Sequence, residues 1–398
     1  MRLAIPNKIR PLRVLLVIAL LEIFLGGGGR LIDTGSLSIR MYLFIITLFF
    51  GAMMVVKRGS LHRPVVILSL AFSCLLVLGA ILGIIHGQPL IFILVDLRPL
   101  LFFYYILFFA ALIRTEEDVE LIKRLLKASG LILAVGYLGI LALIRLGMIP
   151  FQPFYLWANH TEEFFFRGDF AFFYKGFIFL CAGIYFYKWS GGFWSKIAIL
   201  TIIAAVFLTF TRGFVLSFFL LYLFKLALVE KKWIQLAFVL TLSFFLAAGV
   251  WAVVTNSRLG DSRSESDAAR IEQLVELKSP GSVLDVLLGR GFGMLYLPNR
   301  ETQHLEITYI EIFFKQGIIG LAFWAYLAYL IFKYYNTAAK NGRSSRAKPF
   351  LLASMFAYIQ SFTNPYINNP MGMTLLIVSL ISLYILSRPD ESTQPSQK

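Results

Sequence analysis

The sequence has few charged residues and few cysteines. Only 15% of its 398 residues are charged and 59% are hydrophobic, whereas a soluble globular protein carries about 25% charged residues. The two cysteines, Cys74 and Cys181, both lie within apolar runs, so neither a disulfide framework nor a metal site is indicated. These shortages argue against a soluble domain and predict a polytopic membrane protein of the all-α class.

The sequence also lacks two common motifs, a phosphate-binding loop and a signal-peptide cleavage site. The sequence has no GxxxxGK[ST] phosphate loop, so a nucleotide-driven reaction is not indicated. The first apolar run, 14–25, continues into Gly26–Gly29 without a small-x-small cleavage site, and we expect it to remain as the first span. His160 lies beside two glutamates, but a metal site needs more ligands at defined spacing. We therefore predict no metal and no cofactor.

Apolar runs long enough to cross a bilayer recur along the chain. A spanning helix needs roughly 20 apolar residues, and about twelve runs approach that length. These runs lie at 12–29, 39–56, 64–86, 89–113, 127–147, 170–188, 194–211, 213–229, 233–254, 306–333, 349–367 and 370–387. The whole chain, 1–398, is therefore predicted to form a single polytopic membrane domain.

The net charge of +15 has a topological explanation. Lysines and arginines gather on alternate loops, as the positive-inside rule requires of cytoplasmic segments, so no nucleic-acid partner is predicted. An even number of spans puts both termini in the cytoplasm, with 389–398 as a cytoplasmic tail. Two longer segments then lie outside a bacterial inner membrane. They are a first outer loop, 148–169, and a large outer loop, 255–305, between spans 9 and 10.

The large outer loop carries a cluster of arginines. Arg263 and Arg270 are seven positions apart and share a face if both are helical. Arg290 lies in the run LLGRGFGML, where glycines such as Gly291 let backbone N–H groups approach an anion. Guanidinium groups bind phosphate oxygens bidentately. The alternatives are a solvated loop whose arginines pair with acidic neighbours, and a tight glycine turn that re-enters the membrane. For the cluster as a whole we predict a diphosphate site and a catalytic loop.

Three further arginines lie near or inside spans. Arg212 opens a span at the outer face and has no acidic neighbour in sequence, and Arg167 borders the first outer loop. Arg98 lies two residues after Asp96 in a run that Pro99 is expected to break or kink. An arginine in a membrane segment is a functional candidate by default. For Asp96 and Arg98, however, a structural ion pair is the preferred interpretation.

Two groups of residues can contact a glycan. On a helix, His304, Thr308, Glu311 and Lys315 fall on one narrow stripe, and a His or Glu at a cavity rim can take a proton from a sugar hydroxyl. The alternative is that Glu311 and Lys315 neutralise each other as an i,i+4 pair. The aromatic residues of 148–169 can stack on sugars, although a belt at the membrane interface is the preferred interpretation.

The C-terminal half resembles the bacterial O-antigen polymerase and O-antigen ligase superfamily. The matching segments are TRG at 211–213, the helix that bears Arg270, LGRGFG at 288–293, YIEIFFKQGIIGL at 309–321 and SFTNPYINNP at 361–370. The resemblance implies a GT-C-like membrane enzyme that transfers a glycan from undecaprenyl diphosphate without a metal or nucleotide. It also implies that Arg212, Arg270 and Arg290 hold the diphosphate.

Within this resemblance three residues are candidates for activating the acceptor, because the sequence departs from the family pattern. In many members a histidine precedes the GIIG-like turn, and an ungapped match puts Glu306 at that position, two residues after His304. The base is therefore predicted among His304, Glu306 and Glu311. The departure favours a repeat-unit polymerase over the alternative, a ligase that transfers the glycan to lipid A–core.

Two alternatives belong to other classes. A lipid-linked oligosaccharide flippase should show two similar halves and many charges in mid-span, and neither is seen in the sequence. A non-catalytic scaffold would not need the arginine cluster. For the polymerase, the expected partners are an undecaprenyl-diphosphate-linked glycan, membrane lipid and a chain-length regulator.

Overall fold

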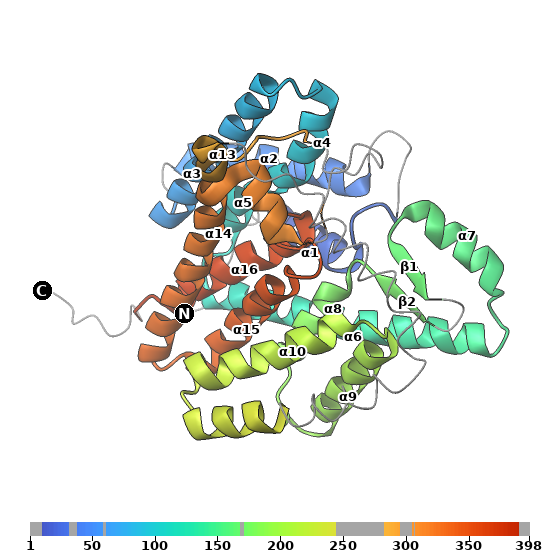
Figure 1. The fold of residues 1–398 in the computed structure, drawn as a ribbon. Coiled ribbons are helices and arrows are strands. Elements are labelled where there is room, and N and C mark those ends of the chain that lie inside the picture. The colour runs from blue at the N-terminus through green and yellow to red at the C-terminus, as the bar shows by residue number, and fades with distance from the viewer. Residues whose placement is uncertain are drawn as a thin grey trace, which may run out of the picture.

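The computed structural model describes residues 10–31, 38–58, 61–167, 171–243, 282–294, 305 and 307–389 (Figure 1). This part of the chain is almost entirely helical and contains one two-stranded sheet, which agrees with the predicted all-α class. Most of the large outer loop lies outside the described residues. Four of the predicted site residues lie there too: Arg263, Arg270, His304 and Glu306.

The N-terminal part of the chain is a series of apolar helices. They are α1 (Arg10–Leu25), α2 (Ile39–Arg58), α3 (Arg63–Ile85), α4 (Leu90–Leu100), the 3-10 turn η2 (Leu101–Tyr104), α5 (Tyr105–Leu112) and α6 (Glu116–Arg145). Pro99 lies in the last turn of α4, and η2 separates α4 from α5, as expected for a proline that cannot donate a helical hydrogen bond. Helix α6 begins well before the predicted span at 127, because Thr115 and Asp118 form a capping box.

The segment predicted as a first outer loop has regular structure. It forms α7 (Phe151–Thr161) and the strand β1 (Phe164–Arg167), which pairs antiparallel with β2 (Ala171–Tyr174). The register pairs Phe164 with Tyr174 and Arg167 with Ala171. Consecutive aromatic residues in both strands favour β structure, so this segment forms a helix and one strand of a hairpin.

The C-terminal part adds the remaining helices. They are α8 (Phe177–Gly183), η3 (Ile184–Phe186), α9 (Phe193–Leu208), α10 (Arg212–Phe224), η4 (Lys225–Val229), the helix Trp233–Ser243, α13 (Val283–Leu288), α14 (Thr308–Lys340), α15 (Ser344–Gln360) and α16 (Pro370–Leu386). A helix thus lies in each of the twelve predicted ranges. Within the described residues, six helical segments are long and apolar enough to cross a membrane: Ile39–Lys57, Arg63–Ile85, Leu90–Leu112, Glu116–Arg145, Arg212–Val229 and Thr308–Lys340.

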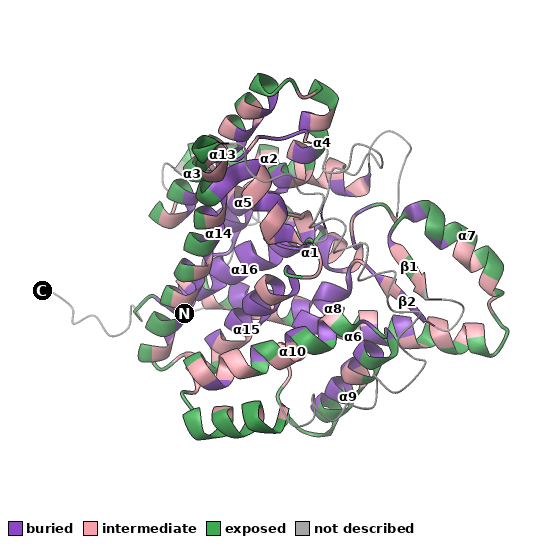
Figure 2. Cartoon of the chain, viewed as in Figure 1, coloured by how far each residue is buried: buried purple, intermediate pink, exposed green. Residues whose placement is uncertain are grey.

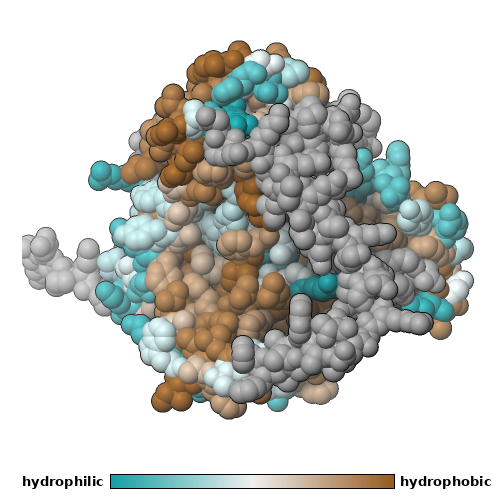
Figure 3. Space-filling view, in the orientation of Figure 1, coloured by the Kyte–Doolittle hydropathy of each residue, from teal (hydrophilic) through white to brown (hydrophobic). Residues whose placement is uncertain are grey.

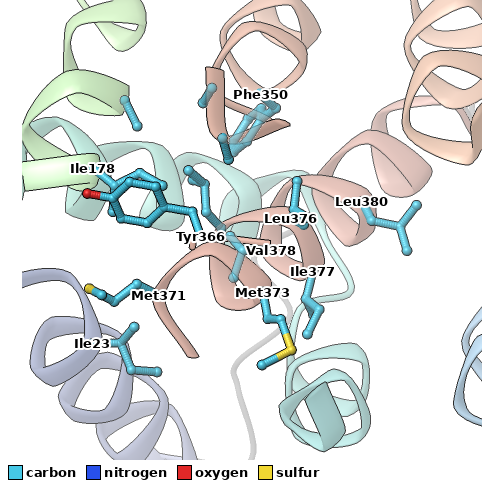
Figure 4. Close-up of a cluster of buried hydrophobic side chains, with 14 of the residues drawn as sticks. Ile23, Ile178, Phe350, Tyr366, Met371, Met373, Leu376, Ile377, Val378 and Leu380 are labelled. Atoms are coloured by element: carbon cyan, nitrogen blue, oxygen red, sulfur yellow. The ribbon is translucent and has the colours of Figure 1, made fainter. Parts of the chain in front are cut away.

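Helix α16 lies at the centre of the bundle. It packs against α1, α5, α6, α14 and α15, and almost every residue along it is buried (Figure 2). Figure 4 shows its methionines and branched side chains between Ile23 of α1, Ile178 of α8 and Phe350 of α15. A helix that is apolar on all sides lies either in a protein core or against lipid. Neighbouring helices surround α16, so it forms the core on which the other helices pack.

The outside of the bundle is also hydrophobic. Large apolar side chains such as Phe49, Ile85 and Leu94 are exposed on α2, α3 and α4, and Figure 3 shows broad hydrophobic areas on one face. Soluble monomers seldom expose apolar patches of this extent. With the six long apolar helices, this surface identifies a multi-pass membrane protein.

Candidate functional site

A cavity of about 900 Å³ lies among the β-hairpin, α4, the start of α10, the first turns of α14 and the segment that joins α15 to α16. The residues that line it include cations, carboxylates, amides and aromatic rings. Its charged lining residues are Asp96, Lys175, Arg212, Glu311 and Lys315. Sequence positions more than 200 residues apart therefore meet in one space.

Lys315 lies between two carboxylates at the wall of this cavity. Its Nζ is 2.7 Å from Oε1 of Glu311 and 2.8 Å from Oδ1 of Asp96. The three side chains are only 4%, 4% and 1% exposed, respectively. The i,i+4 pair of Glu311 and Lys315 is thus confirmed, and Asp96 joins it to make a buried triad. Two carboxylates and one ammonium carry a formal net charge of −1.

The expected ion pair between Asp96 and Arg98 is wrong. Asp96 points into the protein, where its Oδ2 also accepts the N–H of Gly293 at 2.7 Å. Arg98 lies on the exposed side of α4 and donates to Sδ of Met41 at 2.8 Å. Two residues apart on a helix point in different directions, so only Asp96 reaches the cavity, and Arg98 is absent from its lining.

The glycine-rich segment after α13 packs its backbone directly on α14. Gly317 interrupts α14 with φ 63° and ψ −162°. A Cβ on it would lie 2.3 Å from the carbonyl oxygen of Leu287, and a Cβ on Gly291 would lie 2.1 Å from the amide nitrogen of Gly83. Only glycine permits such approach at positive φ. The amide of Gly291 donates to the carbonyl of Lys315 at 3.1 Å, so this N–H is used within the protein and supports the triad.

Arg290 is held in the same segment. Its Nε lies 3.3 Å from Oδ2 of Asp285. Together with His86 and Gln88 these two residues border a separate, smaller pocket, and Arg290 is absent from the lining of the 900 Å³ cavity. The structure therefore does not bring Arg290 beside Arg212.

Two further cations, which are not members of the triad, line the cavity. Arg212 is the first residue of α10; its side chain is exposed and makes no hydrogen bond or ion pair with the described part of the chain. Lys175 follows β2 and is half-buried. Burial lowers the pKa of Lys175, although the carboxylate of Glu163 opposes this shift. Since a helix N-terminus also carries a partial positive charge, this region attracts anions.

Glu163 fixes the hairpin that carries Lys175. It is fully buried, and its carboxylate accepts the N–H groups of Gly28 and Arg30 at 2.6 and 2.9 Å. Its main-chain oxygen accepts the N–H of Lys175 at 3.0 Å. The four-glycine run after α1 thus wraps a carboxylate of the same chain. Glu163 is one of the two glutamates near His160 for which the sequence predicts no metal site, and in the structure it anchors the hairpin.

Arg167 lies at the turn end of β1, where it pairs with Ala171. Three rings of the same hairpin, Phe165, Phe166 and Phe173, line the cavity. Phe165 and Phe166 belong to the segment whose aromatic residues are predicted to form an interface belt, and that prediction stays open. With Phe173 they also form an apolar part of the cavity lining that contains Lys175.

The segment 361–369, called here the hub turn, contacts Glu311, Lys175 and the starts of α10 and α14. Asn368 Nδ2 donates to Oε2 of Glu311 at 3.4 Å, and the hydroxyl of Tyr366 donates to the carbonyl of Lys175, also at 3.4 Å. The hub turn therefore fixes the position of Glu311 relative to Lys175.

The hub turn also holds the starts of two helices. A Cβ on Gly213, the residue after Arg212, would lie 3.0 Å from Oγ1 of Thr363. The N–H of Thr308, which begins α14, donates to the carbonyl of Ser361 at 3.2 Å. The sequence predicted no chemical role for the matching segment SFTNPYINNP at 361–370, and it did not single out Lys175 as a site residue. The sequence offered one signal for Lys175, a lysine directly after an aromatic strand.

The chain was also compared with known proteins. No protein-family model matches it. It is similar to the O-antigen polymerase of Shigella flexneri, with 27% identity over 386 residues, which is 94% of this chain and 95% of that protein. The similarity includes the N-terminal half, where the motifs had matched only generic spans. This near full-length similarity confirms the resemblance to the O-antigen polymerase and O-antigen ligase superfamily.

Proposed function

We propose that this protein is a polymerase that joins undecaprenyl-diphosphate-linked oligosaccharide repeat units into a surface polysaccharide, an O-antigen or a related polymer. The observation that carries the proposal is a cavity lined by two cations, Arg212 and Lys175, which have no ion pair within the described residues, and by a buried carboxylate group, Glu311 with Asp96. Similarity to an O-antigen polymerase over nearly the whole chain supports the reaction class.

We place this cavity at the outer face of a bacterial inner membrane. In this topology about twelve spans cross the bilayer in a GT-C-like arrangement, and both termini and the tail 389–398 are cytoplasmic. Basic residues on alternate loops support this orientation. The segments 148–169 and 255–305 then lie on the same side as the cavity, and the second supplies residues to the site.

The part of the cavity lined by Arg212 and Lys175, called here the cationic region, is the proposed site of the diphosphate leaving group. Arg212 offers a planar fork of donors for phosphate oxygens, and the N-terminus of α10 adds backbone N–H groups. Lys175 provides a second positive charge within the same cavity. Arg263 and Arg270, from the large outer loop, and Arg167, from the hairpin, remain proposed contributors. In this structure Arg98 and Arg290 contact other groups.

The proposed reaction is a direct glycosyl transfer. A hydroxyl oxygen of the acceptor forms a bond with the anomeric carbon of the donor, while the bond from that carbon to the diphosphate oxygen breaks. The leaving diphosphate keeps the electron pair and is stabilised by Arg212 and Lys175. The hydroxyl proton passes to a base, for which Glu311 is the proposed residue within the cavity lining, with His304 and Glu306 as alternatives. Neither a nucleotide nor a metal is required, because the donor is already activated.

The proposal is tested by substitution in cells that lack the native polymerase. Arg212→Ala and Glu311→Gln are compared with Arg145→Ala, since Arg145 is an exposed arginine at the end of α6 and outside the cavity lining. We expect the first two variants to leave single repeats on lipid A, and Arg145→Ala to produce long chains. General acid–base groups contribute roughly 10²–10⁴-fold to rate, so Glu311→Gln should abolish visible polymer.

Other patterns would contradict the proposal. Loss of every lipid-A-attached repeat in the Arg212→Ala strain would indicate a ligase or a flippase. Long chains in both cavity variants would remove this cavity as the site. Membrane insertion of each variant is checked by its amount in the membrane fraction.

A further inference from the structure

A short series of buried hydrogen bonds joins α10 to the end of α15, and these two helices pack side by side (Figure 1). Oγ of Ser217 on α10 donates to Oε1 of Gln360, the last residue of α15, at 2.6 Å. Nε2 of the same amide donates to Oγ1 of Thr363 in the hub turn at 2.9 Å. Ser217 and Gln360 are 1% and 0% exposed. Among the described residues Thr363 belongs to the cavity lining and Gln360 does not, so Gln360 lies behind the cavity wall.

The partners of the Gln360 amide leave it one orientation. The hydroxyl of Thr363 donates to the main-chain oxygen of Gln360 at 3.1 Å, so its oxygen accepts from the amide nitrogen. The amide oxygen then accepts from Ser217. Buried polar groups are costly unless they are hydrogen-bonded, and a satisfied polar network specifies one arrangement of the helices that carry it. A slide of α10 along α15 would break these bonds, whereas a purely apolar interface would tolerate it.

The same groups contact the residue that follows Arg212. A Cβ on Gly213 would lie 3.0 Å from Oγ1 of Thr363 and 3.1 Å from Nε2 of Gln360, closer than the 3.4–4 Å of ordinary van der Waals contact. The backbone of α10 therefore rests directly on these two polar atoms at its second residue. Arg212 and Gly213 both line the cavity, so a shift of the backbone at Gly213 also moves Arg212.

The backbone before Arg212 is held as well. Phe210 has φ +50°, a left-handed conformation that a bulky residue rarely adopts. Next to it, Oγ1 of Thr209 accepts the N–H of Thr211 at 3.2 Å. Such conformations persist only where the surrounding structure imposes them, and they cluster at functional sites. The chain thus fixes the start of α10 on both sides of Arg212.

We propose that Gln360 is a positioning residue that holds Arg212 in place for the diphosphate of the donor. This inference rests on the polymerase function proposed above and adds a residue that the sequence did not indicate. A guanidinium group binds a phosphate through two parallel hydrogen bonds, which require a narrow range of geometry. Gln360 supplies that geometry through Thr363 and Gly213 and touches no substrate itself.

The test measures binding of undecaprenyl diphosphate to the full chain in lipid nanodiscs. The variant combines Ser217→Ala with Gln360→Met, so that the amide becomes an apolar side chain of similar length and its partner hydroxyl is removed too. Thr363 keeps the hydrogen bond from Nδ2 of Asn364. Replacement of both partners is nearly neutral for stability, so we expect the melting temperature of the wild type. Binding should weaken roughly tenfold, the equivalent of one lost hydrogen bond to the diphosphate.

A second variant and a control accompany this double substitution. Gly213→Ala adds a better helix former but presses a Cβ against Thr363 and Gln360, so it should also weaken binding. Ser354→Ala is the matched control. Ser354 is buried on the same helix, and its hydroxyl donates to the carbonyl of Phe350 one turn earlier. We expect Ser354→Ala to bind undecaprenyl diphosphate like the wild type.

The sharpest measurement repeats the double substitution in an Arg212→Ala protein, where Lys175 still supplies a positive charge for residual binding. A residue that acts through Arg212 has no further effect once the guanidinium is gone. A general loosening of the fold would weaken binding with and without Arg212. We therefore expect Ser217→Ala with Gln360→Met to change binding only when Arg212 is present.

The outcomes separate the positioning role from the function on which it rests. Wild-type binding by both the double variant and Gly213→Ala, or an equal loss with and without Arg212, overturns the role of Gln360 while the polymerase can stand. Should the double variant fail to fold, Gly213→Ala decides in the same way. If the wild type does not bind undecaprenyl diphosphate, or if Arg212→Ala binds it equally well, the proposed diphosphate site fails and the positioning role fails with it.

Discussion

Replacement of Lys315 by Met should destabilise the protein strongly, because it removes the one cation between two buried carboxylates. Asp96 and Glu311 have side chains that are 1% and 4% exposed. Loss of one partner from a buried ion pair costs about 3–5 kcal/mol, since the charge left behind has no compensation. Here two carboxylates remain, so we expect a loss at the upper end of that range.

The informative comparison is a neutral triple variant, Asp96→Asn, Glu311→Gln and Lys315→Met. The new amides can still accept the N–H of Gly293 and the Nδ2 of Asn368, which the two carboxylates accept in the described part of the chain. Neutral replacements of buried ions are often tolerated or stabilising. We therefore expect the triple variant to regain most of the stability that Lys315→Met loses, but to make no polymer, since Glu311 is absent.

The measurement is equilibrium unfolding in mixed micelles, with tryptophan fluorescence as the signal. Trp324 is buried on α14 and reports on this helix. The reasoning is refuted if Lys315→Met costs less than about 1 kcal/mol, the value of an exposed ion pair. It is refuted equally if the triple variant is as unstable as the single one, because the loss would then come from packing rather than from unpaired charge.

Three further predictions concern other parts of the molecule. Because burial lowers the pKa of Lys175 below the usual 10.5, undecaprenyl diphosphate binding should weaken as an alkaline titration passes that lowered pKa, and Lys175→Arg should retain binding to higher pH. Gly291→Ala should destabilise the fold by about 1–3 kcal/mol in thermal unfolding, because its φ is +86° and its Cβ would meet the amide of Gly83. Gly87→Ala, with φ +71° and open space, is the matched control and should cost less. Burial, followed by the charge of Arg388, lowers the pKa of His62 to about 4. His62 therefore takes up its proton at higher pH in the unfolded chain than in the folded one, so the stability of the fold decreases as pH drops from 6.5 towards 4. In thermal melts recorded at several pH values, His62→Gln should reduce this pH dependence.

The sequence predicted the local features of the site well. Helical spacing put Thr308, Glu311 and Lys315 on one stripe, and all three are buried on α14. Arg212 was selected because it opens an apolar run without an acidic neighbour, and it lines the cavity unpaired. Pro99 predicted the break between α4 and α5. Each of these predictions rests on residues close together in the chain. Helical periodicity and backbone sterics are sufficient to make such predictions.

Features that depend on distant contacts were not predictable in this way. Asp96 was assigned to Arg98, two positions away, whereas its partner Lys315 is 219 positions away. The glycines near Gly291 suggested an anion cradle, but the close approach that they permit is to other backbone segments. Local spacing cannot distinguish an anion cradle from close backbone packing, because glycine serves both. Only the packing of the helices decides between them.

The place of α16 in the bundle has a consequence for biosynthesis. The ribosome makes this helix after α1, α5, α6, α14 and α15, since chains are made from the N-terminus, yet it is buried among these helices (Figure 1). The earlier helices therefore lack their central packing partner until α16 is made. The hub turn directly precedes α16, so Glu311 and Lys175 gain their shared support only after the helices that carry them have been made. A chain truncated before the hub turn is therefore expected to make no polymer.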